Sequence, residues 1–551
     1  MNNPISSGPV ATGSPPSASP LGAAAPPSGA AAWGAALLWG ILAVGLRIPV
    51  LDESFWVDEL HTSWCIAGDF SDVLPRASAG HQSPLYYWGL FLWRQLFGDS
   101  EWILRGSSVM AGAIATVVIS HAASRRFGSL LVGGLVGVTL AIDQHMFFFS
   151  AELRPYAWVV LVASVALAGE SQCWYRVLRC SRSTWWAAAS VLGFAIHPAA
   201  GLPIVMTAVG MFLKPPLQPK RASSASILWL VFWWVAAAIV AFVLWQNSLA
   251  ATWDARGQWE SFAALRTWPQ LLNLWDWLLW GLPPLVLLVW RRKLFREAWQ
   301  PLGMLHTLTL IVAVHAVFAL GSLLDVVHLW HRRYLIAMLP WLVWLPATAF
   351  GEMRSGGTGF HSAGGGSATG SARGRTAVPV AMLMALWLVA LLWQQGTISD
   401  VMRGSIPVSR HREDWRLAID FVRKNVPRDH RIYVDAGLIE SSAPFLELAS
   451  VDDLPEALDH YLSYPLRGTD TVTNEVQAFP ATLAGYRSFV TENAAGQRFQ
   501  HAVVVSRRDP GPILKNMKPE LAETVETVRF PGVTVWMHRS SPTREQPPET
   551  P

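Results

Sequence analysis

The sequence predicts a polytopic α-helical membrane protein that carries a small α/β domain near its C-terminus. Hydrophobic residues make up 52% of its 551 residues and charged residues only 15%, whereas soluble domains carry about 25% charged residues. Apolar stretches long enough to cross a bilayer recur between residues 33 and 396, but residues 405–540 have the mixed, charged composition of a soluble domain. The 30 Trp suit a chain with many membrane interfaces.

Charge and cysteine content exclude several other classes. The net charge of +4 is small for a chain of this length, so no nucleic-acid partner is expected. Cys65, Cys173 and Cys180 form neither a metal-binding nor a disulfide pattern. The partners that composition does imply are membrane lipids.

Residues 1–32 contain no charged side chain and are rich in Ala, Pro, Ser and Gly, which predicts a disordered tail. A signal peptide would have a basic segment before its apolar core, and none is present here. The first span is therefore expected to remain uncleaved.

About eleven transmembrane helices are predicted, because each needs about 20 apolar residues to cross the hydrocarbon core. Pro84–Phe97 is apolar as well, but its 14 residues suit a re-entrant or interfacial segment, so it is not counted. The predicted spans are 34–51, 105–123, 129–148, 155–171, 184–198, 199–213, 225–246, 272–290, 303–324, 334–350 and 378–396.

The basic residues predict the orientation. With the N-terminus in the cytoplasm, five successive basic clusters fall on the cytoplasmic side, as the positive-inside bias requires. The protein is then a multi-pass protein of the cytoplasmic (inner) membrane, with the first outer loop at residues 52–83. The clusters are Arg125-Arg126; Arg176, Arg179 and Arg182; Lys214, Lys220 and Arg221; Arg291 to Arg296; and Arg354, Arg373 and Arg375.

Residues 351–376 predict a flexible Gly/Ser linker on the cytoplasmic side, before the last span. Residues 405–540 then form the α/β domain, which this topology places outside the cytoplasm, and residues 541–551 form a disordered tail. The expected elements of the domain are a helix at 413–425, strands at 431–435 and 502–506, a helix at 512–524 and a hairpin at 530–537. The domain contains no phosphate-binding loop, which suggests that it binds the acceptor or caps the site.

Asp58 and Glu59 are the leading candidates for chemistry. Two carboxylates after a span are usually solvated loop residues. Here, however, the same face also receives the segments Ala79–Tyr87 and Glu152–Tyr156 and the side chain of His197. The concentration of polar side chains at the outer face favours an interfacial site.

A series of short motifs resembles the GT-C glycosyltransferases, in particular the branch with dolichyl-phosphate-mannose protein mannosyltransferases and lipid A aminoarabinose transferases. The series extends over about residues 34–345, and its order is more specific than any single motif. It comprises Trp56-Val-Asp-Glu59, His81-Gln-Ser-Pro-Leu-Tyr-Tyr87, Leu96-Phe-Gly98, Leu104-Arg105, Arg125-Arg-Phe-Gly128, Ser150-Ala-Glu-Leu-Arg-Pro-Tyr156, His197, Arg333-Tyr334 and Leu339-Pro340.

This resemblance implies transfer of a sugar from a polyprenyl-phosphate carrier to an acceptor hydroxyl, with inversion at the anomeric carbon. It identifies Asp58 as the catalytic carboxylate, and an acceptor hydroxyl does need a positioned base for its proton. Glu59 either places the acceptor or is structural. The sugar is left open, and the acceptor is a lipid, a glycan or a protein.

Fixed cations stabilise the charge that develops on a departing phosphate. Arg154, Arg332 and Arg333 are the candidates, although arginines at span ends also reach toward lipid headgroups. The remaining candidates for substrate binding are Glu152, Tyr156, His197 and Tyr334.

A divalent metal ion is a further possibility that the resemblance raises. His81 stands where some relatives have a metal-binding carboxylate, and an imidazole can replace it. The later outer loop offers Asp254 but no histidine, and Gln82 replaces a phosphate-binding lysine of some relatives. A hydrogen-bonding role is the alternative for His81.

Two other classes fit a polytopic chain: a transporter or flippase of lipid-linked sugars, and a noncatalytic membrane scaffold. A transporter would carry charges near the middle of its spans and repeated halves. Here the spans are nearly free of charged residues apart from Arg47, and no internal repeat is found. A scaffold does not need eleven spans.

Overall fold

The computed structural model of this chain describes most of the helical region and the core of the C-terminal domain. The described residues are 27–80, 82–172, 174–177, 180–212, 260–290, 302–354, 371–403, 413–436, 456–468, 471–479, 502–507 and 525–538, with isolated positions between 232 and 242.

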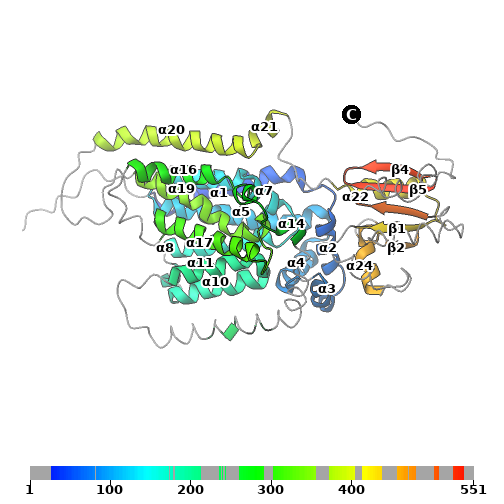
Figure 1. Ribbon diagram of the computed structural model, residues 1–551. Helices are drawn as coiled ribbons and strands as arrows, with labels where there is room; N and C mark the ends of the chain where they lie inside the picture. The colour runs from blue at the N-terminus through cyan, green and yellow to red at the C-terminus, as the bar shows by residue number, and fades with distance from the viewer. Residues whose placement is uncertain are drawn as a thin grey trace, which may run out of the picture.

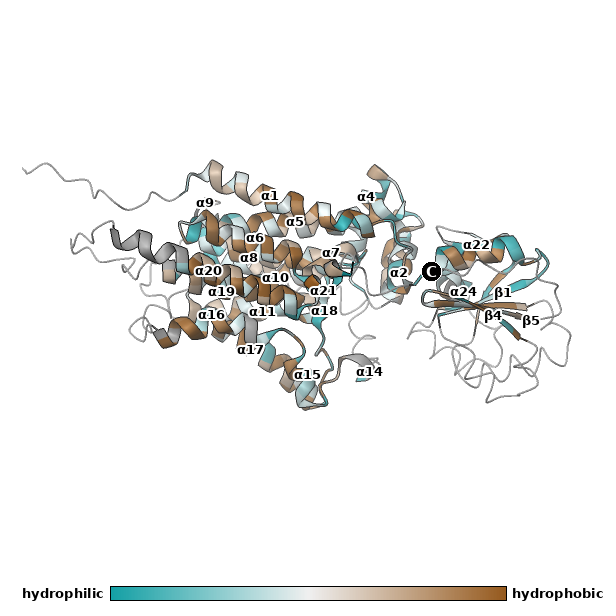
Figure 2. Cartoon of the chain, turned by 90° about the horizontal axis from the view of Figure 1, so that it is seen from above, coloured by the Kyte–Doolittle hydropathy of each residue, from teal (hydrophilic) through white to brown (hydrophobic). Residues whose placement is uncertain are grey.

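The molecule has two parts, a bundle of long helices and a five-stranded sheet with its own helices (Figure 1). Three short helices of the first loop lie between these parts: α2 (Val57–Ile66), α3 (Val73–Ala79) and α4 (Pro84–Phe97). Apolar residues predominate along the bundle helices (Figure 2). The described bundle helices come from residues 29–402 and the sheet comes from residues 431–538.

Four helical segments are long and apolar enough to cross a membrane: Gly29–Val50, Glu101–Arg126, Met304–Leu323 and Arg332–Met353. A bent pair, Leu130–Ile142 with Gln144–Ala151, raises this number to five among the described residues. The predicted total of eleven stays a prediction, because shorter helices account for several expected spans and 225–246 falls largely outside the described residues. The shorter helices are α8 (Tyr156–Gln172), α10 (Arg182–Ile196), α11 (Pro198–Phe212), α15 (Trp268–Leu272) and α16 (Trp277–Trp290). Helix α20 (Ser371–Gln394) has 24 residues, but only Pro379–Gln394 is its apolar part.

Helix α5 (Glu101–Arg126) is the centre of the bundle and packs against α1 (Gly29–Arg47), α6 (Leu130–Ile142), α7 (Gln144–Ala151) and α8. Small residues allow this close packing. A Cβ atom added to Gly112 would lie 2.6 Å from the Cβ of Ser150 on α7. This close approach brings the segment after α7 beside the first loop, where the candidate site lies.

The predicted span 129–148 is not one continuous helix. It divides at Asp143 into α6 and α7, which are bent by 55°. The Asp143 carboxylate accepts hydrogen bonds from the amides of His145 and Met146, and so caps α7. The predicted linker also ends earlier than expected, because α20 begins at Ser371.

Four further helices complete the bundle: α17 (Met304–Leu323), α18 (Arg332–Leu335), α19 (Leu339–Arg354) and the short α21 (Thr397–Met402). A 3-10 turn at Ile336–Met338 joins α18 to α19, and α14 (Glu260–Ala263) and α9 (Trp174–Val177) are single turns. The uncounted segment Pro84–Phe97 is the complete helix α4.

The C-terminal sheet has the strand order β2-β1-β3-β5-β4. Strands β1 (Arg431–Asp435), β2 (Val476–Ala478) and β3 (Ala502–Ser506) are parallel, and Val434 pairs in register with Val505. Strand β5 (Val533–His538) runs antiparallel to β3 and to β4 (Val525–Phe530). The strands predicted at 431–435 and 502–506 and the hairpin near 530–537 are therefore confirmed.

The hairpin turns at Pro531-Gly532, where Gly532 has a φ of +64° that suits a residue without a Cβ atom. Helix α22 (Trp415–Asn425) buries Trp415, Ile419 and Val422, the three residues predicted to share its apolar face. Helix α24 (Glu456–Arg467) packs near β1 and β2 and against α2 of the first loop.

Several predictions concern parts of the chain outside the described residues. These are most of the N-terminal tail, His81, the basic clusters at 214–221 and 291–296, the loop with Asp254, most of the Gly/Ser linker, the helix at 512–524 and the tail at 541–551.

Candidate active site

Asp58 and Glu59 occupy the first turn of α2, where negative charge is favoured by the helix dipole. Successive residues on a helix point about 100° apart. The two carboxylates therefore enter different surroundings: the Glu59 side chain is 2% exposed and that of Asp58 is 24% exposed.

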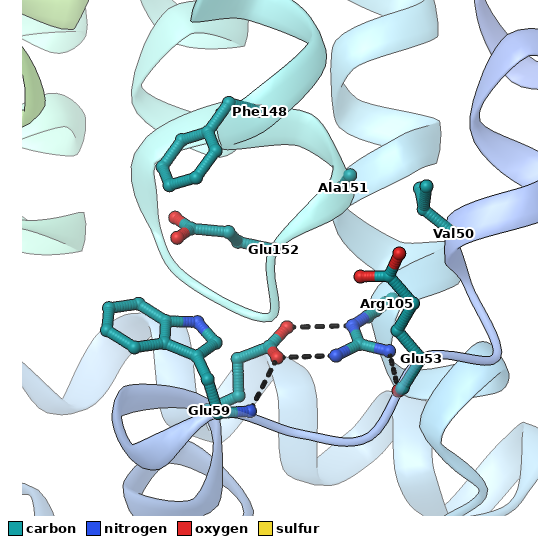
Figure 3. Close-up of a pocket in the computed structure, with 8 residues that line it drawn as sticks. Val50, Glu53, Glu59, Arg105, Phe148, Ala151 and Glu152 are labelled. Carbon is teal, nitrogen blue, oxygen red and sulfur yellow. Dashed lines mark hydrogen bonds and ion pairs between the residues drawn. The ribbon is translucent and has the colours of Figure 1, made fainter. Parts of the chain in front are cut away.

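Glu59 is fully engaged by neighbouring groups. Its carboxylate accepts hydrogen bonds from Arg105 Nε at 2.8 Å and Nη2 at 2.5 Å, and from the backbone amides of Leu153 at 2.7 Å and Trp56 at 3.3 Å. Figure 3 shows the paired contacts with Arg105. Arg105 in turn donates to the carbonyl oxygens of residues 51, 53 and 54. Glu59 thus joins the first loop to α5 and to the segment after α7.

The space beside this ion pair is small. A cavity of about 10 Å³ lies between Glu59, Arg105 and Glu152 (Figure 3). A cavity needs about 10–15 Å³ to hold one water molecule. The pocket around Glu59 therefore has no room for a sugar.

Asp58 lies between two arginines. Its carboxylate is 3.9 Å from Nη2 of Arg154 and 3.8 Å from Nη1 of Arg333. These distances make ion pairs but not hydrogen bonds. Within the described part of the chain, no hydrogen bond reaches the Asp58 carboxylate, so its oxygens are available to a substrate.

Arg154 is held in place by the helix that carries Asp58. Its Nη1 donates to the backbone oxygen of Asp58 at 3.0 Å and to Oγ1 of Thr62 at 3.2 Å. The Arg154 side chain is only 6% exposed, and its Nε–H has no hydrogen-bond partner among the described residues. A buried donor without a partner is costly, and an anion placed there would satisfy it.

The charges around Asp58 set its protonation. Burial raises the pKa of Asp58, but the positive charges of Arg154, Arg333 and Arg507, with a smaller effect of His61, outweigh burial and lower it overall. Asp58 is therefore a carboxylate at neutral pH.

An aromatic wall continues from this ion cluster. The Tyr156 ring lies 5.3 Å from the His197 ring, and that ring lies 6.2 Å from the ring of Tyr334. His197 also accepts a hydrogen bond from the amide of Ala200 at the start of α11. The buried Glu152 is close enough for its charge to act on Arg154.

The structure thus brings most of the predicted site residues together: Asp58, Glu152, Arg154, Tyr156, His197, Arg333 and Tyr334. Arg332 points elsewhere, because its Nε and Nη2 donate to the carbonyl oxygens of Leu274 and Asn273 at 2.8 and 2.7 Å. It is adjacent to Arg333 in sequence but not part of this cluster.

The described residues do not form a metal site. Over the described ranges, no three His, Cys, Asp or Glu side chains lie close enough to hold a metal ion. Asp58 faces arginines, which are not metal ligands. The role predicted for His81 concerns a residue outside the described part and stays a prediction.

Glu413 and Arg507 also reach this site, and the sequence analysis did not identify them. Oε2 of Glu413 accepts a hydrogen bond from the backbone amide of Val57, next to Asp58, at 3.0 Å. Oε1 pairs with Nε of Arg507 at 2.6 Å. Both belong to the C-terminal part, about 350 residues or more after Asp58, and no local pattern in the sequence indicates such a contact.

No protein-family model matches this chain, and no curated protein matches it in sequence. Among solved structures it is similar to ArnT from Cupriavidus metallidurans bound to undecaprenyl phosphate, with 14% identity and a TM-score of 0.52 over 93% of this chain and 99% of that chain. The apo structure of the same protein gives 15% identity and a TM-score of 0.50 over 93% of this chain and 98% of that chain. At these identities the likeness shows the fold alone, which this chain shares with ArnT.

Proposed function

We propose that this chain is an integral-membrane glycosyltransferase that moves a sugar from a polyprenyl-phosphate carrier to an acceptor hydroxyl at the outer face of the membrane. The observation that carries the proposal is the carboxylate of Asp58, which is ionised, free of hydrogen bonds from described residues and placed between Arg154 and Arg333. The fold supports it, since ArnT with this fold was solved with undecaprenyl phosphate bound.

The two arginines would hold the carrier phosphate. A guanidinium presents five donors in a rigid fork that matches phosphate oxygens. Arg154 is already positioned by Thr62 and the Asp58 backbone, and no described residue accepts a hydrogen bond from its buried Nε–H. Negative charge that develops on the departing phosphate is stabilised where these donors point.

Asp58 would accept the proton of the acceptor hydroxyl. The acceptor oxygen forms a bond to the anomeric carbon as the bond from that carbon to the phosphate oxygen breaks. The proton passes to Asp58 and the bonding electron pair leaves on the phosphate. Attack opposite the leaving phosphate inverts the anomeric configuration.

Carrier binding also improves Asp58 as a base. Arg154 and Arg333 lower the pKa of Asp58 in the free protein, which makes it a weak base. A phosphate that accepts from the same guanidinium groups partly neutralises them, so the pKa of Asp58 rises when the donor is bound. The base is thus strengthened only in the complex that reacts.

Glu59 is assigned a positioning role in this proposal, because its carboxylate already accepts four hydrogen bonds and lies beside a cavity too small for a sugar. Arg332 is assigned no contact with the carrier. The acceptor and the sugar stay open among a lipid, a glycan and a protein, and between hexosyl and pentosyl donors.

The test measures transfer of label from a radiolabelled polyprenyl-phosphate sugar in membranes that contain the wild-type chain, Asp58→Asn or Asp420→Asn. Asp420 lies on α22 with a half-exposed side chain, and the same chemical change there is the matched control. Loss of a general base costs about 10²- to 10⁴-fold in rate, and we expect that loss for Asp58→Asn alone. Equal transfer by both variants would exclude the proposed role. Movement of intact carrier across the membrane without sugar loss would favour a flippase.

A further inference from the structure

The C-terminal part holds α2, the helix that carries Asp58, at both of its ends. Glu413 contacts the first residue of α2, and α24 contacts its second half. Figures 1 and 2 both show α2 between the bundle and the sheet. The position of Asp58 therefore depends on a part of the chain that the predicted membrane core does not include.

At the N-terminal end, Glu59 of the helix accepts the amide of Trp56, but the N-cap residue offers no side-chain acceptor to the amides that follow. The N-cap residue is Trp56, whose side chain offers no oxygen to accept the first backbone amides. Glu413 supplies that acceptor from outside, with Oε2 3.0 Å from the amide nitrogen of Val57. A carboxylate at this place also matches the helix dipole.

Glu413 is itself fixed within the C-terminal part. Its side chain is 4% exposed, accepts a hydrogen bond from Trp415 Nε1 at 3.1 Å and forms an ion pair with Arg507, whose Nε lies 2.6 Å from Oε1. Arg507 directly follows β3, and its backbone amide donates to the carbonyl oxygen of Asp435 at the end of β1. The parallel core of the sheet thus directs Glu413 and Arg507 toward Asp58.

At the other end, α24 contacts one flank of α2. Nε1 of Trp64 donates to Nδ1 of His460 at 3.0 Å, and the hydroxyls of Ser63 and Tyr464 lie 3.3 Å apart. The Tyr461 ring packs 4.7 Å from the ring of Trp64. Because Glu413 contacts the start of α2 and α24 contacts its second half, α2 cannot move without breaking contacts to the C-terminal part.

We propose that Glu413 and Arg507 are positioning residues of the active site, through which the docked C-terminal domain fixes Asp58 relative to Arg154 and Arg333. The proposal rests on the glycosyltransferase function proposed above. It gives the C-terminal domain a part in the reaction, since a displacement of about 1 Å can cost about 100-fold in rate. In support, Arg507 is also among the cations that lower the pKa of Asp58.

The first test does not need activity. Hydrogen exchange of the segment 55–60 is compared between the full-length wild type, Glu413→Ala and Arg416→Met. Arg416 is the matched control, because it also joins the two parts, through Glu101 on α5, Asp52 and Ser54, while the described residues show no contact from it to the Val57 amide. Its partner Glu101 accepts the amide of Phe55, so the comparison is read at Val57. We expect faster exchange at Val57 in Glu413→Ala only. Unchanged exchange in this variant overturns the proposal even if the chain is not a glycosyltransferase.

The second test measures the pH dependence of kcat/KM for Arg507→Met, Arg507→Lys and Arg416→Met. Loss of the Arg507 charge should move the acid limb of the profile to higher pH and lower kcat about tenfold, whereas Lys should restore the profile. A purely structural role predicts the same result for Arg507→Met and Arg416→Met, with no shift of the limb, and would overturn the proposal.

Discussion

Asp58 and Glu59 show how neighbouring carboxylates acquire opposite roles. Glu59 has a buried arginine partner and four hydrogen bonds, whereas Asp58 has two cations at ion-pair distance and no hydrogen bond from the described residues. The sequence predicted the importance of the pair, because the surrounding motifs gather at one face. It could not assign the roles, because Arg105 and Leu153 approach from other helices.

The same reasoning applies to Arg332 and Arg333. Both were candidates in sequence, being adjacent arginines at the start of a span, and the motif Arg333-Tyr334 favoured Arg333. They lie on a single short helix, so their side chains diverge, one to backbone carbonyls near α15 and the other to Asp58. The direction of each side chain depends on helix geometry that the sequence of this short segment does not reveal.

Replacement of Glu59 by Gln should destabilise the protein. The change leaves Arg105, whose side chain is 4% exposed, without its charged partner. Breaking a buried ion pair costs about 3–5 kcal/mol. Thermal unfolding in detergent should show a clearly lower midpoint for Glu59→Gln than for Asp58→Asn, which removes no hydrogen bond. Equal midpoints would contradict the structural role of Glu59.

The depressed pKa of Asp58 predicts how stability depends on pH, and it predicts that the acid limbs of kcat/KM and of kcat lie at different pH values. Its folded pKa is depressed, so the ionised group stabilises the fold above its unfolded pKa, and that contribution is lost as pH falls through the folded pKa. The acid limb of kcat/KM, which reports the free enzyme, should therefore lie below the pH at which an ordinary aspartate titrates. The acid limb of kcat reports the complex with the donor. It should lie at higher pH, because the carrier phosphate partly neutralises the charges of both arginines and so raises the pKa of Asp58. Coincident limbs would mean that the phosphate does not contact these arginines.

At the scale of elements, periodicity predicted well wherever one face of an element is buried. Helix α22 buries Trp415, Ile419 and Val422 as expected, and β1 and β3 are the apolar runs that the sequence indicated. The predicted span at 129–148 is a bent pair of helices, and the sequence pattern did not show the bend because hydropathy averages over the break. The sequence does contain a sign of the break, because Asp143 is a capping residue inside an apolar run. Helix α6 ends at this residue and α7 begins after it.

Helix α2 was missed as an element for another reason. Its ten residues mix apolar and polar side chains, because the helix is buried on almost every side by partners of different polarity. One side meets the bundle through Glu59, and another meets the C-terminal part through Trp64 and Tyr464. No single hydrophobic stripe results, so periodicity could not reveal the helix that carries the leading catalytic candidate.

At the scale of the whole molecule, helix α5 carries an acidic residue at its N-terminal end and two arginines at its C-terminal end. Helix α5 is 26 residues long, about 39 Å at 1.5 Å per residue, enough to cross a hydrocarbon core of about 30 Å. Its first residue, Glu101, pairs with Arg416 of the C-terminal part, and its last turn carries Arg125 and Arg126. The candidate site and the C-terminal part thus share one end of this helix, and the arginine pair marks the other.

This arrangement predicts opposite accessibility for the two ends of α5 in intact cells. Single cysteines would replace Asp420 on α22 and Arg125 in a chain whose three natural cysteines are removed, and each would be exposed to a membrane-impermeant thiol reagent. The positive-inside bias places Arg125 and Arg126 in the cytoplasm. We therefore expect labelling at position 420 in intact cells and at position 125 only after permeabilisation. The reverse pattern would place Asp58 on the cytoplasmic side, where a carrier that presents its sugar outside could not reach it.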